Sequence, residues 1–211
     1  MNSQKIALFG TPGESTRRFA TEALRRGHHV TVVVPNEREF TLKHPNLAVV
    51  SGDVKKNYDV SRFAQGHDVV ICTYEPTQAK PREHAEITRS VIEGVKDSGV
   101  HHLISVAHPF GQPKERTEEA YNEFKPIVKA QHEALKLFQK EDQLHWGYAH
   151  SIEPEIEEKT GKYRSTNEIL FSSPEGQTRI PLEGYTSTII DEAEKNEVEL
   201  HGFGGEEGKE D

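Results

Sequence analysis

The feature that most constrains this chain is a short apolar run near its start that ends in a turn with two glycines. Residues 5–9 read Lys-Ile-Ala-Leu-Phe, Gly10-Thr-Pro-Gly13 follows, and an amphipathic stretch begins at Ser15. Glycine in such a turn lets the backbone approach a pyrophosphate, and the first N–H groups of the next helix attract the anion. The sequence therefore predicts the opening strand, turn and helix of a nucleotide-binding βαβ unit.

The match to the three-glycine form of this turn is incomplete. Thr16 stands where G-x-x-G-x-x-G has its third glycine. That glycine normally allows close packing of the helix on the strand, so we expect looser packing here and less room for a phosphate. Two glycines alone also occur in ordinary strand-to-helix turns. The rest of the sequence is therefore needed to distinguish a nucleotide-binding turn from an ordinary one.

Apolar runs rich in β-branched residues alternate with amphipathic stretches along most of the chain. This alternation predicts an α/β fold, a Rossmann-like doubly wound parallel sheet in three αβα layers. We expect one domain over residues 1–203 and a flexible acidic tail over 204–211. Ligands of such sheets bind beyond the carboxyl ends of the strands. The strands are expected at 5–9, 29–34, 47–51, 69–73, 102–105 and 145–149, and the helices at 15–26, 60–65, 81–97 and 117–140.

Composition excludes several classes of protein. The 211 residues carry a net charge of −9 and no basic stripe, which argues against binding to nucleic acid or an anionic membrane. The one cysteine, Cys72, excludes an internal disulfide and suits a reducing compartment. The polar N-terminus reaches the first expected strand within five residues, so we expect no signal peptide, and no apolar run has the length of a membrane span. We therefore expect a cytoplasmic protein, with a homodimer left open.

Several motifs resemble one known family. They are Gly10-Thr-Pro-Gly13, Ser51-Gly-Asp-Val54, Gly66-His-Asp-Val-Val-Ile71 and Lys159-Thr-Gly-Lys-Tyr163. Their order and spacing resemble the atypical short-chain dehydrogenase/reductases, in particular the small NAD(P)H-binding group called NmrA-like or NADH-flavin reductase-like, up to about Phe203. The resemblance implies an NAD(P)H-dependent oxidoreductase that transfers hydride to a small acceptor such as a flavin or quinone.

The resemblance also implies a cofactor site. Asp53 would accept a hydrogen bond from the adenine amino group, and residues of the first turn would meet the pyrophosphate. The family often has Arg-Asn after the second strand, whereas this chain has Pro35-Asn36. Arg17 and Arg38 are the candidate substitutes for reading a 2′-phosphate, so we expect NADP slightly more than NAD; the alternative is that both are ordinary surface residues. The complete expected set is Gly10, Thr11, Pro12, Gly13, Ser15, Thr16, Arg17, Asn36, Arg38, Asp53, Val54, Thr73 and Tyr74.

The catalytic residues of the wider superfamily have partial counterparts. Tyr121 and Lys125 have the Tyr-x-x-x-Lys spacing of a proton donor and its lysine, and Ser105 ends the fifth expected strand, where a serine would polarise a carbonyl. Val106 follows it in place of the usual small residue. The alternative is that Tyr121 packs on the sheet and Lys125 is solvated.

Other features leave competing interpretations open. His101, His102 and His108 cluster in sequence but lack the spacing of a zinc site, so no metal is expected. The acidic segment 153–158 stands where the family often has an apolar substrate wall. These departures favour a second hypothesis, a non-catalytic NAD(P)-binding sensor or scaffold of the NmrA type. A third is a protein that has lost nucleotide binding.

Overall fold

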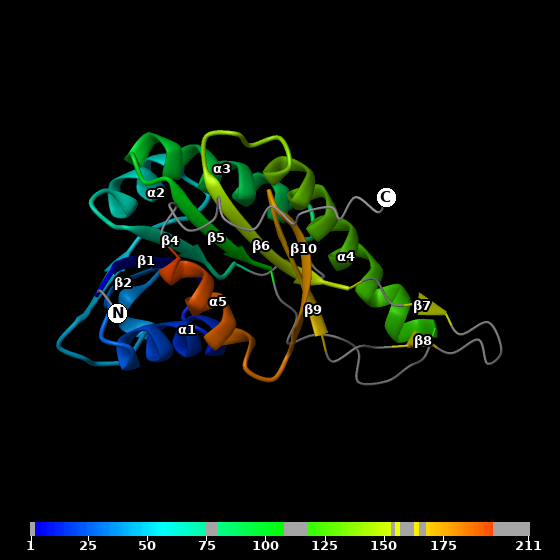
Figure 1. The fold of residues 1–211 in the computed structure, drawn as a ribbon, viewed down its shortest axis with the longest axis horizontal. Coiled ribbons are helices and arrows are strands. Elements are labelled where there is room, and N and C mark those ends of the chain that lie inside the picture. The colour runs from blue at the N-terminus through cyan, green and yellow to red at the C-terminus, as the bar shows by residue number, and fades with distance from the viewer. Residues whose placement is uncertain are drawn as a thin grey trace, which may run out of the picture.

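The computed structural model describes residues 3–74, 80–107, 118–152, 155–156, 163–164 and 168–195 (Figure 1). The strands are β1 (Lys5–Phe9), β2 (His29–Val34), β3 (Leu47–Ser51), β4 (Val69–Cys72), β5 (His102–Val106), β6 (His145–Ser151), β7 (Glu155–Ile156), β8 (Tyr163–Arg164), β9 (Glu168–Ser173) and β10 (Gly176–Pro181). The helices are α1 (Glu14–Arg25), α2 (Asn57–Ala64), α3 (Glu83–Ser98), α4 (Glu118–Phe138) and α5 (Tyr185–Glu194), with a 3-10 turn, η1 (Glu37–Glu39). The predicted tail over 204–211 and the domain boundary at 203 lie outside the described residues.

The main sheet has the strand order β10-β9-β6-β5-β4-β1-β2-β3, and β1 to β6 run parallel. The chain leaves β1 toward β3 on one side and resumes at β4 on the other. This reversal places a topological switch point between β1 and β4, where doubly wound sheets bind ligands. The predicted Rossmann-like fold is confirmed.

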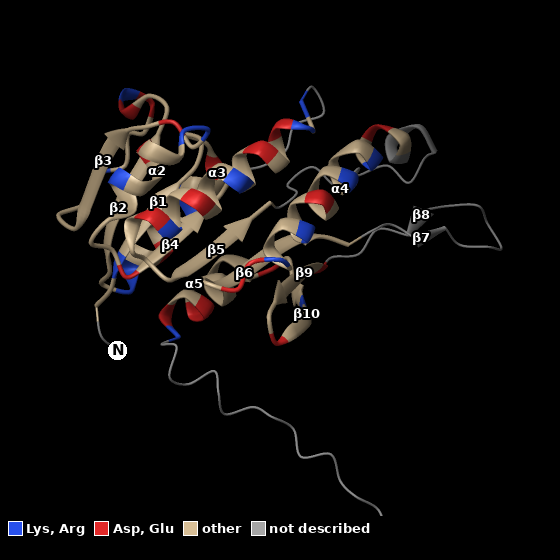
Figure 2. Cartoon of the chain, turned by 90° about the horizontal axis from the view of Figure 1, so that it is seen from above, with Lys and Arg blue, Asp and Glu red and all other residues tan. Residues whose placement is uncertain are grey.

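Helices cover both faces of the sheet, as Figure 1 shows. Phe19 of α1 and Ile189 of α5 belong to the core cluster on one face, and Val60, Val91 and Ala134 of α2, α3 and α4 belong to the cluster on the other. Basic and acidic residues are interspersed along α2, α3 and α4 (Figure 2). No helix in the described part of the chain is both long and apolar enough to cross a membrane.

Two parts of the prediction need correction. The sheet is not wholly parallel, because β9 pairs antiparallel with β6 and β10 antiparallel with β9. These strands, the β7–β8 pair and α5 are absent from the predicted elements. Along β10 only Ile180 is buried, so this edge strand has no continuous apolar run to reveal it. Helix α2 also begins at Asn57, three residues before the predicted start.

Candidate functional site

The turn between β1 and α1 presents unpaired backbone N–H groups. The first helical hydrogen bond is donated by Arg17 N–H to the carbonyl of Gly13 at 3.2 Å, and no described side chain caps the start of the helix. The N–H groups of the preceding helical residues therefore lack intrahelical acceptors. Among the described residues, a Cβ built on Gly13 would contact only Thr11 Oγ1, at 3.5 Å, so no described residue closes this side of the turn. The turn fits a pyrophosphate on both counts.

The second residue of α1 adds a side-chain donor to this turn. Ser15 is 8% exposed, and its Oγ has no hydrogen-bond partner in the described part of the protein. A buried hydroxyl without a partner is uncommon in native proteins and calls for a ligand, water or ion. Ser15 thus supports an anion site at the start of α1.

Thr16 points away from the open side of the turn. It is completely buried, and its Oγ1 lies 2.9 Å from Oγ1 of Thr73, the residue after β4. Thr73 Oγ1 donates to the carbonyl of Phe9 at 3.2 Å, so the proton shared by the two threonines comes from Thr16. A Cβ on Gly10 would overlap both hydroxyls. Where the motif has its third glycine, this chain therefore has a hydrogen bond that joins α1 to the end of β4.

The segment after β2 is organised by Asn36. Its Oδ1 accepts from Arg38 N–H at 3.2 Å, and its Nδ2 donates to Glu39 Oε1 at 2.7 Å. The Asn36 amide is therefore already committed to capping η1. The Arg38 side chain is exposed and forms no ion pair with any described residue. Of the two, Arg38 is the side chain left available to a ligand.

Arg17 reaches this same segment from α1. Its guanidinium lies 5.5 Å from the centre of the Phe40 ring, and it donates to Thr41 Oγ1 at 3.3 Å. A guanidinium above an aromatic ring is attracted to the ring face. These contacts place the Arg17 charge beside the segment that follows β2.

The ends of β3 and β4 supply the remaining expected cofactor residues. Asp53 Oδ1 accepts from Lys55 N–H at 3.0 Å, while Oδ2 lies 3.9 Å from Lys56 Nζ. Val54 is buried beside this turn. Tyr74 is half-buried, and burial raises its pKa. Together with Gly10 and Asn36, these residues follow four neighbouring parallel strands and so lie along one edge of the sheet.

Two of the three expected catalytic residues, Ser105 and Lys125, have described side chains. Ser105 is buried on β5, in register with Cys72 on β4 and Tyr148 on β6. Lys125 is exposed on α4, and no hydrogen bond joins it to any described residue. Tyr121 belongs to α4, but its side chain lies outside the described set, as does His108.

A buried polar pair beside Ser105 is not singled out by the sequence alone. His84 Nε2 lies 2.9 Å from the Tyr148 hydroxyl, and burial lowers the pKa of His84 to about 4. His84 precedes Ile87 and Val91 at helical spacing, on the apolar face of α3. This spacing is a sequence signal for burial of His84, but it does not reveal the pairing with Tyr148.

Cys72, the last residue of β4, is buried, and burial raises its pKa to about 11. His102 packs against His145 with ring centres 4.9 Å apart. No group of three His, Cys, Asp or Glu residues in the described segments is arranged to hold a metal ion.

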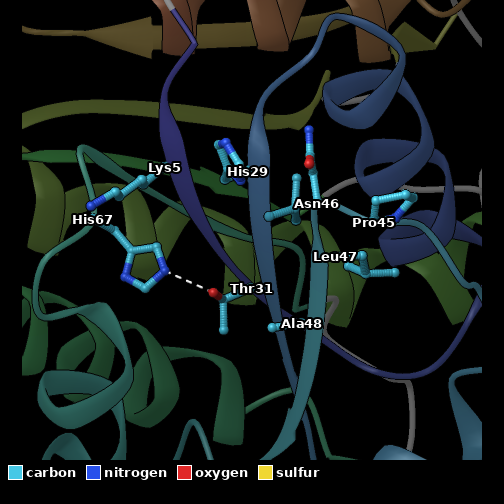
Figure 3. Close-up of a pocket in the computed structure, with 9 residues that line it drawn as sticks. Lys5, His29, Thr31, Pro45, Asn46, Leu47, Ala48 and His67 are labelled. Carbon is cyan, nitrogen blue, oxygen red and sulfur yellow. Dashed lines mark hydrogen bonds between the residues drawn. The ribbon is translucent and has the colours of Figure 1, made fainter.

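An open notch of about 340 Å³ lies at the opposite edge of the sheet (Figure 3). Lys5, His29 and Leu47, the first residues of β1, β2 and β3, line it, and His67 Nε2 lies 2.8 Å from Thr31 Oγ1. Because these are the amino ends of the strands, the notch is separate from the turn at Gly10.

Comparisons with known proteins agree with this geometry. A family model described as NAD(P)H-binding matches residues 10–181. The chain is 25% identical over 206 residues to YwnB, an uncharacterized Bacillus subtilis (strain 168) protein, covering 92% of this chain and 93% of YwnB. It is similar to a Bacteroides thetaiotaomicron structure provisionally described as an epimerase, with 26% identity, a TM-score of 0.65 and 92% of each chain covered. A Streptococcus pneumoniae TIGR4 structure provisionally described as an NADH-flavin reductase is 23% identical, with a TM-score of 0.60 over 91% of this chain and 93% of that one.

Proposed function

We propose that this chain, which belongs to the NAD(P)H-binding family, is an oxidoreductase that transfers hydride from NAD(P)H to a small acceptor such as a flavin or quinone. The observation that carries the proposal is the turn at Gly10–Gly13, which offers uncapped N–H groups, an open side at Gly13 and the unpartnered Ser15 hydroxyl. The description of the S. pneumoniae structure agrees with this reaction class, although its 23% identity establishes the fold only.

Different residues along the carboxyl edge would bind different parts of the cofactor. Ser15 and the N–H groups of α1 would hold the pyrophosphate, and Asp53 would accept from the adenine amino group through Oδ2. Tyr74 would line the path between these subsites. The bound cofactor supplies a reduced nicotinamide as hydride source, and the protein's part is to hold it in place and limit access of water.

For the adenosine end we propose a slight preference for NADPH. Arg38 has no ion-pair partner among the described residues, and Arg17 is held beside the same segment by Phe40 and Thr41. Both guanidinium groups suit a 2′-phosphate. Equal affinity for NADPH and NADH would contradict this preference, and Arg38→Ala is expected to reduce it.

For the chemical step we propose that Ser105 polarises the acceptor and that Tyr121, with Lys125, donates a proton. Unchanged turnover of Tyr121→Phe would contradict the role of the pair. The exposed position of Lys125 favours a second candidate function, the non-catalytic dinucleotide sensor or scaffold. Cofactor binding without cofactor oxidation by any acceptor distinguishes the sensor from the enzyme.

The first experiment is titration of the purified protein with NADPH and NADH by fluorescence and calorimetry at fixed salt, followed by an acceptor screen with flavins and quinones. Gly13→Ala is expected to fold normally, because its φ of −97° suits alanine, and to weaken cofactor binding about tenfold or more. Thr21→Ala, exposed on α1, is the control and should bind like the wild type. Absence of binding at millimolar cofactor would refute both candidate functions.

We propose a dinucleotide and a small-molecule acceptor as the partners, without nucleic acid or membrane, and a cytoplasmic location. The buried single cysteine, Cys72, supports a reducing compartment. Cell fractionation tests the location, and light scattering tests whether the protein is a homodimer.

A further inference from the structure

The N-terminal end of α3 contains a buried imidazole with one unused nitrogen. His84 is the second residue of α3 and is 2% exposed. Its Nε2 is paired with the Tyr148 hydroxyl at 2.9 Å, whereas Nδ1 has no partner among the described residues. Buried polar atoms in native proteins are nearly always paired, so an unpaired one calls for a functional explanation.

The position of this pair relates it to the cofactor edge. Helix α3 follows β4, so its first turn lies at the carboxyl edge of the sheet, where Gly10 and Thr73 also lie. Tyr148 is in register with Ser105, and residues side by side in a sheet point to the same face. His84, through Tyr148, is therefore on the same face of the sheet as Ser105.

The protonation states of the two groups follow from their burial. Burial lowers the pKa of His84 to about 4 and raises that of Tyr148 well above its usual value, so both are neutral at neutral pH. If Nε2 carried the imidazole proton, the phenol proton and the Nδ1 lone pair would both lack partners. If the phenol donates to Nε2, only the Nδ1 proton lacks one. The second arrangement leaves fewer buried groups unpaired and makes Nδ1 a hydrogen-bond donor.

We propose that His84 donates a hydrogen bond from Nδ1 to a carbonyl oxygen of the electron acceptor, and that Tyr148 positions it for this role. The inference rests on the proposed hydride transfer. The acceptor receives two electrons and one hydrogen from the C4–H bond of the reduced nicotinamide, leaving NAD(P)+, and takes up one proton, the one assigned above to Tyr121. Negative charge develops on its carbonyl oxygen before that proton arrives, and a donor in a water-poor site stabilises it.

A neutral imidazole at the first turn of a helix suits this task. The positive end of the helix dipole disfavours the imidazolium form, so the ring acts as a donor without giving up its proton. His84 is then a catalytic residue that contacts the acceptor. Tyr148 is a positioning residue, because its hydroxyl donates to Nε2 and so keeps the proton of the His84 ring on Nδ1.

Two substitutions separate the two nitrogens. His84→Asn places an amide near the position of Nδ1, while His84→Gln extends its amide to the position of Nε2. With a quinone and NAD(P)H, His84→Gln is expected to lower kcat about 100-fold with KM for NAD(P)H unchanged, and His84→Asn to retain most of the activity. The matched control is His102→Gln, a buried histidine at the amino end of β5, with wild-type kcat. A wild-type kcat for His84→Gln would overturn the proposal.

Nitrogen NMR on 15N-histidine-labelled wild-type protein tests the proposal without any variant having to fold. The expected spectrum shows His84 protonated on Nδ1, and a quinone added to the protein with NADP+ shifts that signal. A proton on Nε2 would overturn the assignment. So would a shift produced by NADP+ alone, because the carbonyl would then belong to the nicotinamide carboxamide. Wild-type protein that binds NAD(P)H and oxidises none with any acceptor refutes the proposed function instead, while the NMR result still decides whether His84 binds a carbonyl.

Discussion

The hydrogen bond between Thr16 and Thr73 gives a quantitative test of how the phosphate-binding turn is built. Valine keeps the branched shape of threonine and removes only the hydroxyl. In Thr16→Val, Thr73 still donates to the carbonyl of Phe9, so the loss is one hydrogen bond, about 1 kcal/mol. In Thr73→Val, the buried Thr16 hydroxyl loses its acceptor and the cost rises to about 2 kcal/mol. The Phe9 carbonyl is not abandoned, because Thr73 N–H also donates to it at 2.7 Å.

The double variant should cost less than the sum of the single ones. Removing both hydroxyls leaves no unpaired donor, so we expect about 2 kcal/mol in place of about 3, a coupling free energy of about 1 kcal/mol. Urea unfolding of the wild type and the three variants measures it, provided the m-values agree. Thr21→Val, exposed on the same helix, controls for the change of side chain. Additive costs would refute the inferred hydrogen bond.

The same variants test the direction of the Thr16 side chain. Because its only proton goes to Thr73, Thr16 has none to offer a phosphate, and Thr16→Val should change the Kd for NADPH less than about threefold. A tenfold loss of affinity without a matching loss of stability would show that the hydroxyl contacts the cofactor.

Three further predictions follow from buried groups. Acid should unfold the protein between about pH 6.5 and 4. Burial lowers the pKa of His84, His102 and His150 from 6.5 to about 4, so the unfolded state binds more protons than the folded state in this window. Each histidine therefore contributes about 3 kcal/mol of stability that is fully present above pH 6.5 and is lost as the pH falls through 4. A circular-dichroism titration with no loss of structure above pH 4 would contradict this. Arg26→Gln should lower Tm by about 4–8 °C, since it removes the cation that joins carboxylates of α1 and α5; an unchanged Tm in a thermal scan would argue against that role. Gly10→Ala should reduce folded yield and cofactor binding together, because its methyl group overlaps the two threonine hydroxyls beneath it, and calorimetry showing wild-type affinity would exclude the overlap.

The parallel part of the sheet could be predicted because the residues of each strand carry the signal for that strand. Residues 32–34 and 69–72 are continuous apolar runs, and such runs are what a strand buried on both faces requires. The turn at Gly10 and the left-handed Gly27, with φ of 87°, mark the ends of strand and helix within a few residues. The expected cofactor residues follow from the same rule, since parallel strands bring their carboxyl ends to one edge.

The rest depends on contacts between segments far apart in the chain. Arg26 joins α1 to Asp191 of α5, 165 residues away. No sequence pattern near either residue predicts this ion pair. The direction of Thr16 depends on Thr73, 57 residues further on. An arginine, a threonine or a histidine has the same local signature whether it faces solvent or a buried partner, so the sequence identifies these residues without assigning their roles.

The arrangement of donors bears on which acceptors the proposed enzyme would reduce. Reduction of a simple ketone produces an alkoxide, a strong base that requires a proton from a nearby acid during the reaction. Reduction of a quinone or flavin spreads the new charge over a conjugated ring, so stabilisation by hydrogen bonds is enough and the proton can come from water. Lys125 is exposed, and the buried donors on this face of the sheet are neutral groups such as Ser105 and His84. Such neutral donors suit the second kind of acceptor, and for this reason flavins and quinones come before ketones in the acceptor screen.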